Sequence, residues 1–282
     1  MPPSSQPILG LDTATHTASA ALVMPDGQLL AEGTLDTSRR GDDLLVLLDD
    51  LCRRAGLSPS ELGAVAVGGG PGSFTGLRIG MATAKGVAFA AGCPLWISSS
   101  LAAMAAEAAA TVAAAVTVAA AATDAGDASD ASDASDAPLI LPLLDARRGE
   151  VYCGFHSAAA GTPALGPERV MAPEMLASAV AELQGAGSPP RRLWCCGDAL
   201  EAHPEGLAPW AARWLSCART PSGLWVARLA LAGARHDDLT AGRPAYLRPA
   251  EAEVKYPDGV PGARRTSALT QAPPSRAATS GD

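Results

Sequence analysis

Glycines and a proline crowd into the stretch GGGPGSFTG, which occupies residues 68–76. An apolar run at 64–67 precedes this stretch, and a segment with helical character follows it to about Ala91. A glycine-rich loop between a strand and a helix presents free backbone N–H groups at the helix N-terminus, where they stabilise an anion such as phosphate. The candidate phosphate site consists of Asp12, Gly70, Gly72, Ser73 and Thr75.

Three known loop motifs do not fit this stretch. The Walker A motif requires Gly-Lys followed by Ser or Thr, but Gly76 is followed by Leu77 and Arg78. The dinucleotide-binding fingerprint and the nucleophile elbow both need a glycine at position 75, which is Thr75. A tight turn with Ser73 or Thr75 as helix N-cap is the structural alternative, and the spacing leaves both interpretations open.

Carboxylates stand at two further positions where chemistry is conceivable. Asp12 ends an apolar run and could hold a metal–phosphate group or cap a turn. Asp145 and Glu150 flank the segment 147–149, Arg-Arg-Gly, an arrangement that suits acid–base work or, more often, a salt-bridged turn. The sequence identifies no proton acceptor beside them.

Histidines and cysteines are not spaced like metal ligands. No two of the four His residues are three, four or five positions apart, and no two Cys form a C-x-x-C pair. Neither a metal centre nor a catalytic residue set is therefore predicted. The adjacent Cys195 and Cys196 lie in an apolar run and are expected to be small buried hydrophobic residues.

The chain is acidic, with 21 Lys plus Arg against 29 Asp plus Glu and a net charge of −8. A protein that grips nucleic acid unaided needs a clustered basic surface. If this chain works on nucleic acid, a partner is expected to provide the surface that binds it. The first ten residues lack the basic and apolar regions of a secretory signal, so we expect a cytoplasmic chain with reduced thiols.

Hydrophobic periodicity predicts strand, strand, strand, helix, strand, helix, strand over the first hundred residues. The expected elements are strands at 8–12, 18–24 and 28–35, a helix at 42–55, a strand at 64–67, a helix to about 91 and a strand at 93–97. Further strands are expected at 139–144, 151–156 and 192–196, with helices at 173–183 and 222–235. The first order recurs in the ribonuclease-H-like fold, the repeating unit of the actin-like ATPases, so we consider an α/β protein of that class.

Two predicted helices have faces that another chain could use. A stripe with almost no side-chain bulk recurs every four residues at Gly76, Gly80, Ala84 and Ala88. Leu44, Leu48 and Leu51 form an apolar stripe on the helix at 42–55. Each stripe can pack on the chain's own sheet or receive a helix of a partner.

Alanine dominates residues 101–122, the only membrane-like stretch of the sequence. Because alanine drives insertion weakly and Glu107 interrupts the run, a soluble Ala-rich helix is expected. Asp then recurs every third position within 123–137, a period that fits neither a helix nor a strand. That segment is expected to be a disordered loop, and it lacks the glycines that shape calcium loops.

The same patterns predict two lobes and a tail. The N-terminal ribonuclease-H-like lobe covers 1–100 and is completed by the helix near 222–236, and the C-terminal lobe covers 101–221. Residues 257–282 are Pro, Ala, Gly, Ser and Arg without an apolar period, which predicts a disordered tail.

Four segments resemble the TsaB family, in the family's order. ILGLDTAT at 8–15 is similar to its first strand, and GPGSFTGLRIG at 70–80 is similar to its most specific signature. DARRGEVY at 145–152 and PAYLR at 244–248 resemble its second and C-terminal signatures. The resemblance extends over about residues 7–250, and the Asp-rich loop and the tail depart from it.

This resemblance implies an actin-like fold of two lobes and a role in making N6-threonylcarbamoyladenosine at position 37 of tRNA. In the family's pathway the homologue TsaD binds a metal through a His-x-x-x-His pair and transfers the threonylcarbamoyl group. TsaB is its dimerisation subunit, and the ATPase TsaE is a third member. The helix at 42–55, where such a pair would lie, contains no His.

The resemblance therefore implies a non-catalytic subunit without a cofactor of its own, with ATP or ADP expected only at the junction with TsaD. The expected contact residues are Leu44, Leu48, Leu51, Gly76, Gly80 and Ala84. The same patch would serve a homodimer when the chain is alone.

Two alternatives stay open. In the first, the chain is itself an ATP-dependent transferase or kinase of the actin-like superfamily, and Asp12 and the glycine loop hold nucleotide and metal. Magnesium-dependent ATP binding with turnover would favour that alternative. The second is a peptidase, for which the sequence offers no Ser–His–Asp or His–metal set.

Overall fold

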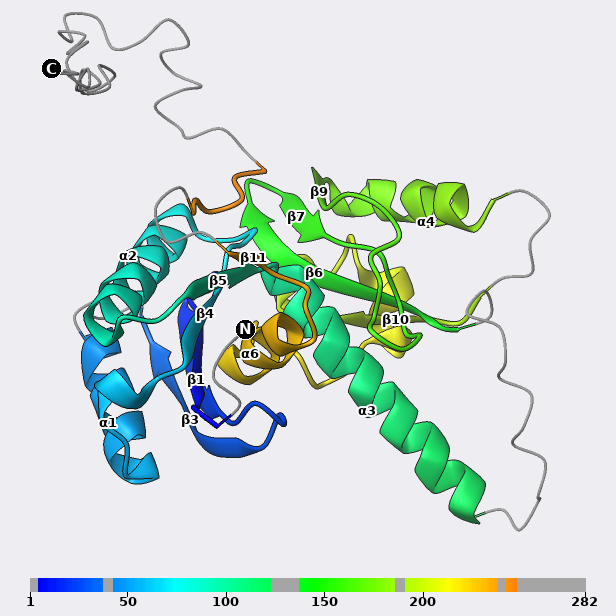
Figure 1. Cartoon of the computed structure of the whole chain (residues 1–282). Coiled ribbons are helices and arrows are strands. Elements are labelled where there is room, and N and C mark those ends of the chain that lie inside the picture. The colour runs from blue at the N-terminus through cyan, green and yellow to red at the C-terminus, as the bar shows by residue number, and fades with distance from the viewer. Residues whose placement is uncertain (1–4, 38–42, 123–136, 186–190, 238–241, 248–282) are drawn as a thin grey trace, which may run out of the picture. The chain divides into compact units, whose positions relative to one another are not determined.

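Two β-sheets organise the part of the chain that the computed structural model describes, which is residues 5–37, 43–122, 137–185, 191–237 and 242–247 (Figure 1). The first sheet has the strand order β11-β5-β4-β1-β2-β3. Its strands are β1 (Ile8–Asp12), β2 (Thr17–Val23), β3 (Leu29–Asp36), β4 (Ala64–Gly68), β5 (Leu95–Ser98) and β11 (His236–Asp237).

The first three strands form an antiparallel meander, and the next two extend the sheet in parallel with β1. Parallel neighbours need crossover connections. The helices α1 (Leu44–Ala55) and α2 (Phe74–Ala91) provide them, after the 3-10 turn η2 (Pro59–Glu61) in the first case. This is the ribonuclease-H-like order predicted from the sequence.

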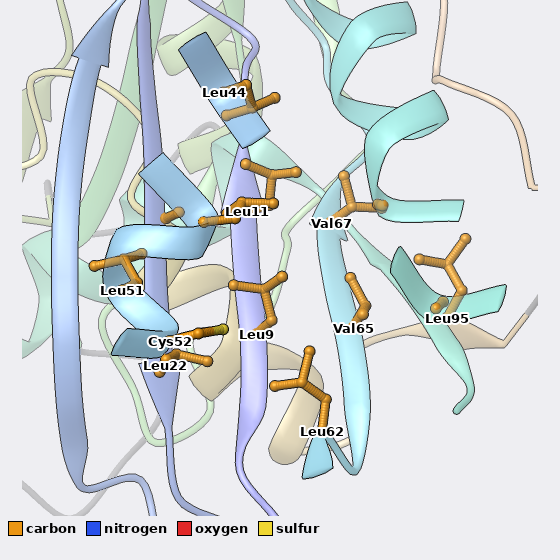
Figure 2. Close-up of a cluster of buried hydrophobic side chains, with 14 of the residues drawn as sticks. Leu9, Leu11, Leu22, Leu44, Leu51, Cys52, Leu62, Val65, Val67 and Leu95 are labelled. Carbon is orange, nitrogen blue, oxygen red and sulfur yellow. The ribbon is translucent and has the colours of Figure 1, made fainter. Parts of the chain in front are cut away.

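Alternating side chains of the first sheet pack against helices on its two faces. Leu9 and Leu11 of β1 share a core with Leu51 of α1 (Figure 2), and Met81 of α2 belongs to the same core. Ile8, one position away, belongs instead to the core formed with α6 (Gly223–Leu231). The helices α1 and α2 therefore cover one face, and α6 covers the other.

The N-terminus of α6 rests directly on β1. A Cβ atom built on Gly10 would lie 2.0 Å from the carbonyl oxygen of Gly223, so glycine at position 10 is what allows this approach. The helix α6, more than 200 residues away from β1 in sequence, thus covers this face of the first sheet. The lobe boundaries stay a prediction.

The second sheet has the order β10-β6-β7-β9, with β8 also pairing with β6. Its strands are β6 (Leu139–Arg147), β7 (Glu150–Cys153), β8 (His156–Ser157), β9 (Arg169–Met171) and β10 (Leu193–Cys196). The helices that follow or flank them are α3 (Ser100–Ala122), η3 (Pro173–Met175), α4 (Leu176–Gln184), α5 (Ala199–Ala202) and η4 (Ala208–Arg213). The predicted helix at 173–183 is thus a 3-10 turn followed by α4, because Pro173 begins the turn and an α-helix continues from Leu176.

The Ala-rich helix α3 packs its N-terminal half into the protein. Leu101, Met104 and Ala108 share a core with Ile140 and Leu144 of the second sheet. Residues 100–118 are long and apolar enough to cross a membrane, but a core helix of a soluble protein passes the same test, and 33% of the span is buried. The predicted disordered segments lie outside the described residues, except Ala137 at the end of the Asp-rich loop.

Candidate functional site

The glycine loop uses its backbone N–H groups within the chain. Four donations are present: from Gly69 to the Ser98 carbonyl (2.8 Å), from Gly70 to Ser100 Oγ (3.2 Å), from Ser73 to the Ala14 carbonyl (2.7 Å) and from Gly76 to Ser73 Oγ (3.3 Å). Ser73 is the N-cap of α2, as the structural alternative predicted. These four donors are not aimed at a ligand, although a phosphate cradle needs such groups free.

Asp12 is enclosed rather than open to a metal. Its side chain is fully buried, Oδ1 accepts from the Ala14 N–H and Oδ2 accepts from Ser100 Oγ, both at 2.7 Å. Burial raises the pKa of the carboxyl group to about 6, against the hydrogen bonds from Ser100 and Ala14, which lower it. The geometry therefore favours a capped turn and does not fit a metal–phosphate group, and nucleotide binding stays a prediction.

The pKa of a second buried ionisable group, His156 of β8, is shifted in the opposite direction. Burial lowers its pKa to about 4, and neither ring nitrogen makes a hydrogen bond of good geometry with the described residues. Between pH 6.5 and 4 the unfolded chain therefore binds a proton that the folded chain does not, so acidification destabilises the fold. Asp12 has the opposite effect on stability. Between pH 6 and 3.8 the folded chain binds a proton that the unfolded chain does not, so acidification stabilises the fold.

His156→Leu is expected to separate these effects. Relative to wild type, the variant should gain about 2.5 kcal/mol in its free energy of unfolding when the pH falls from 8 to 4.5, since only the wild type must exclude a proton. Urea unfolding at the two pH values measures the gain. Asp12→Asn should instead lose stability relative to wild type as the pH falls from 8 to 4.5. If the free energy of unfolding of His156→Leu changed with pH in the same way as that of wild type, the lowered pKa of His156 would be refuted.

The hairpin between β6 and β7 forms the salt-bridged turn that the sequence suggested. Asp145 accepts from the Arg147 N–H (2.8 Å) and pairs with the Arg147 guanidinium (3.2 Å). Arg147 and Arg148 both have left-handed backbone, with φ of 61° and 56°, and such residues are uncommon outside glycine. The Arg147 side chain also reaches the β1–β2 turn, where Nη2 lies 2.6 Å from His16 Nε2.

Sequence reasoning missed His203 as a partner of this turn. Its Nε2 lies 3.1 Å from Asp145 Oδ1, and Asp198 Oδ1 accepts from the Asp145 N–H at 3.0 Å. His203 is 58 residues away from Asp145 and follows the short helix α5, so no local pattern connects the two. The cluster ties the hairpin to α5 and to the first sheet, which is a structural role.

The six predicted contact residues turn inward, so that prediction is wrong. Leu44, Leu48 and Leu51 are 5% exposed or less and lie in the core between α1 and the first sheet. Figure 2 shows Leu44 and Leu51 there. The small residues Gly76 and Gly80 face the loop that follows β1, and Ala84 belongs to the core of the first sheet. A Cβ on Gly80 would lie 2.0 Å from Thr13 Oγ1, one on Gly76 would lie 2.2 Å from the Thr13 carbonyl oxygen, and Ala84 is fully buried.

A second small-residue stripe faces solvent on the opposite side of α2. We define the outer face of α2 as Ile79, Ala82, Gly86, Phe89 and Ala90, all of them exposed. Phe89 is 79% exposed, and Leu45 and Val46 of α1 are 61% and 62% exposed. Because α1 and α2 cover the same face of the sheet, these side chains all lie on the side away from it. Large apolar groups gathered on one face indicate an interaction surface.

An open cavity of about 310 Å³ lies elsewhere, between α3, α6 and the segment 158–162. Four alanines of α3 line one side of it, and none of the predicted site residues lines it. Its Arg228 already donates to the Gly27 carbonyl and lies over the Trp225 ring. Among the described residues, no group of three His, Cys, Asp or Glu side chains is placed to hold a metal ion.

The chain matches one family model and resembles several known proteins in sequence. A family model described as "TsaD: tRNA N6-adenosine threonylcarbamoyltransferase" matches residues 39–190, which is 152 of 282 residues. The Escherichia coli protein named "tRNA threonylcarbamoyladenosine biosynthesis protein TsaB" is 33% identical over 145 residues, 51% of this chain and 52% of that protein. A Haemophilus influenzae protein of the same name is 38% identical over 98 residues, 35% of this chain and 41% of that protein. The chain thus spans about half the length of the curated relatives it matches.

Among solved structures, a Pseudomonas aeruginosa protein described as similar to peptidase YeaZ superposes with a TM-score of 0.64 at 27% identity, over 86% of this chain and all of the other. This likeness confirms the predicted α/β fold class with its actin-like, ribonuclease-H-like architecture. The chain therefore belongs to the family that the TsaD model describes, and within it the chain resembles the proteins named TsaB.

Proposed function

We propose that this protein is a non-catalytic subunit of the complex that makes N6-threonylcarbamoyladenosine at position 37 of tRNA in the cytoplasm. In this role it pairs with the catalytic subunit TsaD through the outer face of α2, and TsaE joins as the ATPase. The exposed apolar face is the observation that carries the proposal. The names of the TsaB relatives in E. coli and H. influenzae support its place in this biosynthesis.

The kinship with TsaD supports the form of the contact. The TsaD family model matches a range that contains both α1 and α2, so the transferase has counterparts of these helices. Two similar helix pairs can meet around a pseudo-twofold axis as a four-helix contact. Ala82, Gly86 and Ala90 are small enough to allow close approach of a helix. Ile79 and Phe89 provide large apolar side chains on either side of them. A second copy of the chain would fit the same face when TsaD is absent.

Several observations support a role without chemistry of its own. Asp12 is buried against Ser100, and N–H groups of the glycine loop already have acceptors in the chain. The net charge of −8 suits a subunit whose partner makes most of the contacts with the tRNA. Transfer of the threonylcarbamoyl group to the adenine amine is then the work of TsaD.

Reconstitution tests this proposal. Threonylcarbamoyl-adenylate and unmodified tRNA are combined with TsaD and TsaE, with or without this protein, and the modified nucleoside is measured by mass spectrometry. Modification is expected only when TsaD and this protein are both present. Modification by this protein without TsaD, or full modification by TsaD and TsaE without it, would contradict the proposal.

A further inference from the structure

A C-terminal segment lies beside the start of α2. We call residues 242–247 the strap. The N–H of Ala245 donates to the carbonyl of Gly69 at 2.7 Å, and the carbonyl oxygen of Ala245 lies 3.3 Å from where a Cβ on Gly70 would be. On the other side of Tyr246, Leu247 packs against the core shared by α3 and the second sheet. The backbone around Tyr246 is therefore fixed on both sides.

Tyr246 uses this fixed position to support an exposed aromatic residue of α2. Its ring lies 5.0 Å from the ring of Phe74, centroid to centroid, with 35° between the planes. The guanidinium carbon of Arg78 lies 4.8 Å from the centroid of the Phe74 ring. Such ring–ring and cation–ring contacts are favourable and directional. Phe74 and Tyr246 nevertheless stay 40% and 43% exposed, so the stack presents its surface to solvent.

The stack continues the outer face of α2 at the N-terminal end of the helix. Phe74 is the first residue of α2, and Phe74, Arg78 and Ala82 of the outer face follow one another at intervals of four residues, which places them along one side of the helix. A partner helix that lies along Ile79 and Phe89 would also reach this end. The partner chemistry that fits is an apolar surface opposite Phe74 with a carboxylate opposite Arg78.

Resting on the proposed function, we propose that Tyr246 is a positioning residue of the TsaD contact. It holds Phe74, and through Phe74 it orients Arg78 toward an acidic residue of the partner. The strap thereby makes residues 244–247 of the C-terminal signature part of the docking surface, although they are remote in sequence from α1 and α2. Tyr246 acts through Phe74 and not through its hydroxyl group.

A double-mutant cycle on the full-length protein tests this role. The affinity for TsaD is measured by titration calorimetry for Tyr246→Ala, Phe74→Ala and the double variant. Each single variant is expected to bind about 5- to 20-fold more weakly, and the double variant no more weakly than Phe74→Ala. Tyr246→Phe should bind like wild type, because the ring is retained. If Tyr246→Ala folds poorly, Tyr246→Leu takes its place in the cycle.

Other outcomes separate this inference from the proposed function. Wild-type affinity of Tyr246→Ala, or losses that add in the double variant, would overturn the positioning role. Phe89→Asp serves as the control for the proposed function, since Phe89 lies outside the stack. If Phe89→Asp abolishes binding and Tyr246→Ala does not weaken it, only the strap inference fails. If Phe89→Asp itself binds normally, the proposed contact fails.

Discussion

Gly80→Val is expected to lower the free energy of unfolding by about 3 kcal/mol and the melting temperature by roughly 10 °C. A Cβ at this position would lie 2.0 Å from Thr13 Oγ1 and 3.2 Å from both Thr13 Cβ and Cγ2. Thr13 has little freedom to yield, because it is buried and its hydroxyl donates to the Gly76 carbonyl at 2.8 Å. Either α2 or the loop after β1 must move. Thermal unfolding followed by circular dichroism measures the loss.

Gly86→Val is the matched control in the same helix. Among the described residues nothing lies within 4 Å of a Cβ built on Gly86, so there is room for the new side chain. The stability of this variant is expected to stay within about 0.5 kcal/mol of wild type. Equal stability of the two variants would mean that the stripe through Gly80 does not pack on the chain's own β1 loop.

The pair of glycines also explains why the contact residues were assigned to the wrong side. Small residues recur every four positions twice on α2, once through Gly80 and Ala84 and once through Ala82 and Gly86. Spacing identifies both stripes but carries no information about which one meets the sheet. That choice depends on the approach of Thr13, which comes from a different part of the chain.

Local patterns were sufficient for the order of the elements in the first hundred residues, but they did not reveal the short strands β9 and β11. The apolar runs at 8–12 and 64–67 are buried strands of the first sheet, and the helix predicted at 42–55 ends at Ala55, where Gly56 has left-handed backbone. The N-cap role of Ser73 was one of two interpretations left open, and Ser73 does cap α2. Each of these features depends on residues close in sequence.

Contacts between distant segments could not be predicted in this way. The pairs His203–Asp145 and Tyr246–Phe74 join residues that share no helix or strand. Neither pair has a periodicity or a spacing that would reveal it. Both became visible only when the fold brought their backbones together.

Phe89→Asp is expected to weaken the affinity for TsaD at least about 100-fold, equivalent to roughly 2.7 kcal/mol. Phe89 is 79% exposed in the isolated chain, so its replacement should leave the melting temperature unchanged. In the complex the new carboxylate would be buried in an apolar contact without a partner, which is costly. Formation of the modified nucleoside in the reconstituted reaction should fall in parallel at limiting protein concentration.

Val118→Asp provides the matched control. Val118 lies on α3, is 70% exposed and receives the same change of charge away from the outer face of α2. The most direct measurement is a side-by-side titration of TsaD with the wild-type, Phe89→Asp and Val118→Asp proteins. Docking through the outer face of α2 predicts that only Phe89→Asp loses affinity. Equal binding by all three proteins would contradict it.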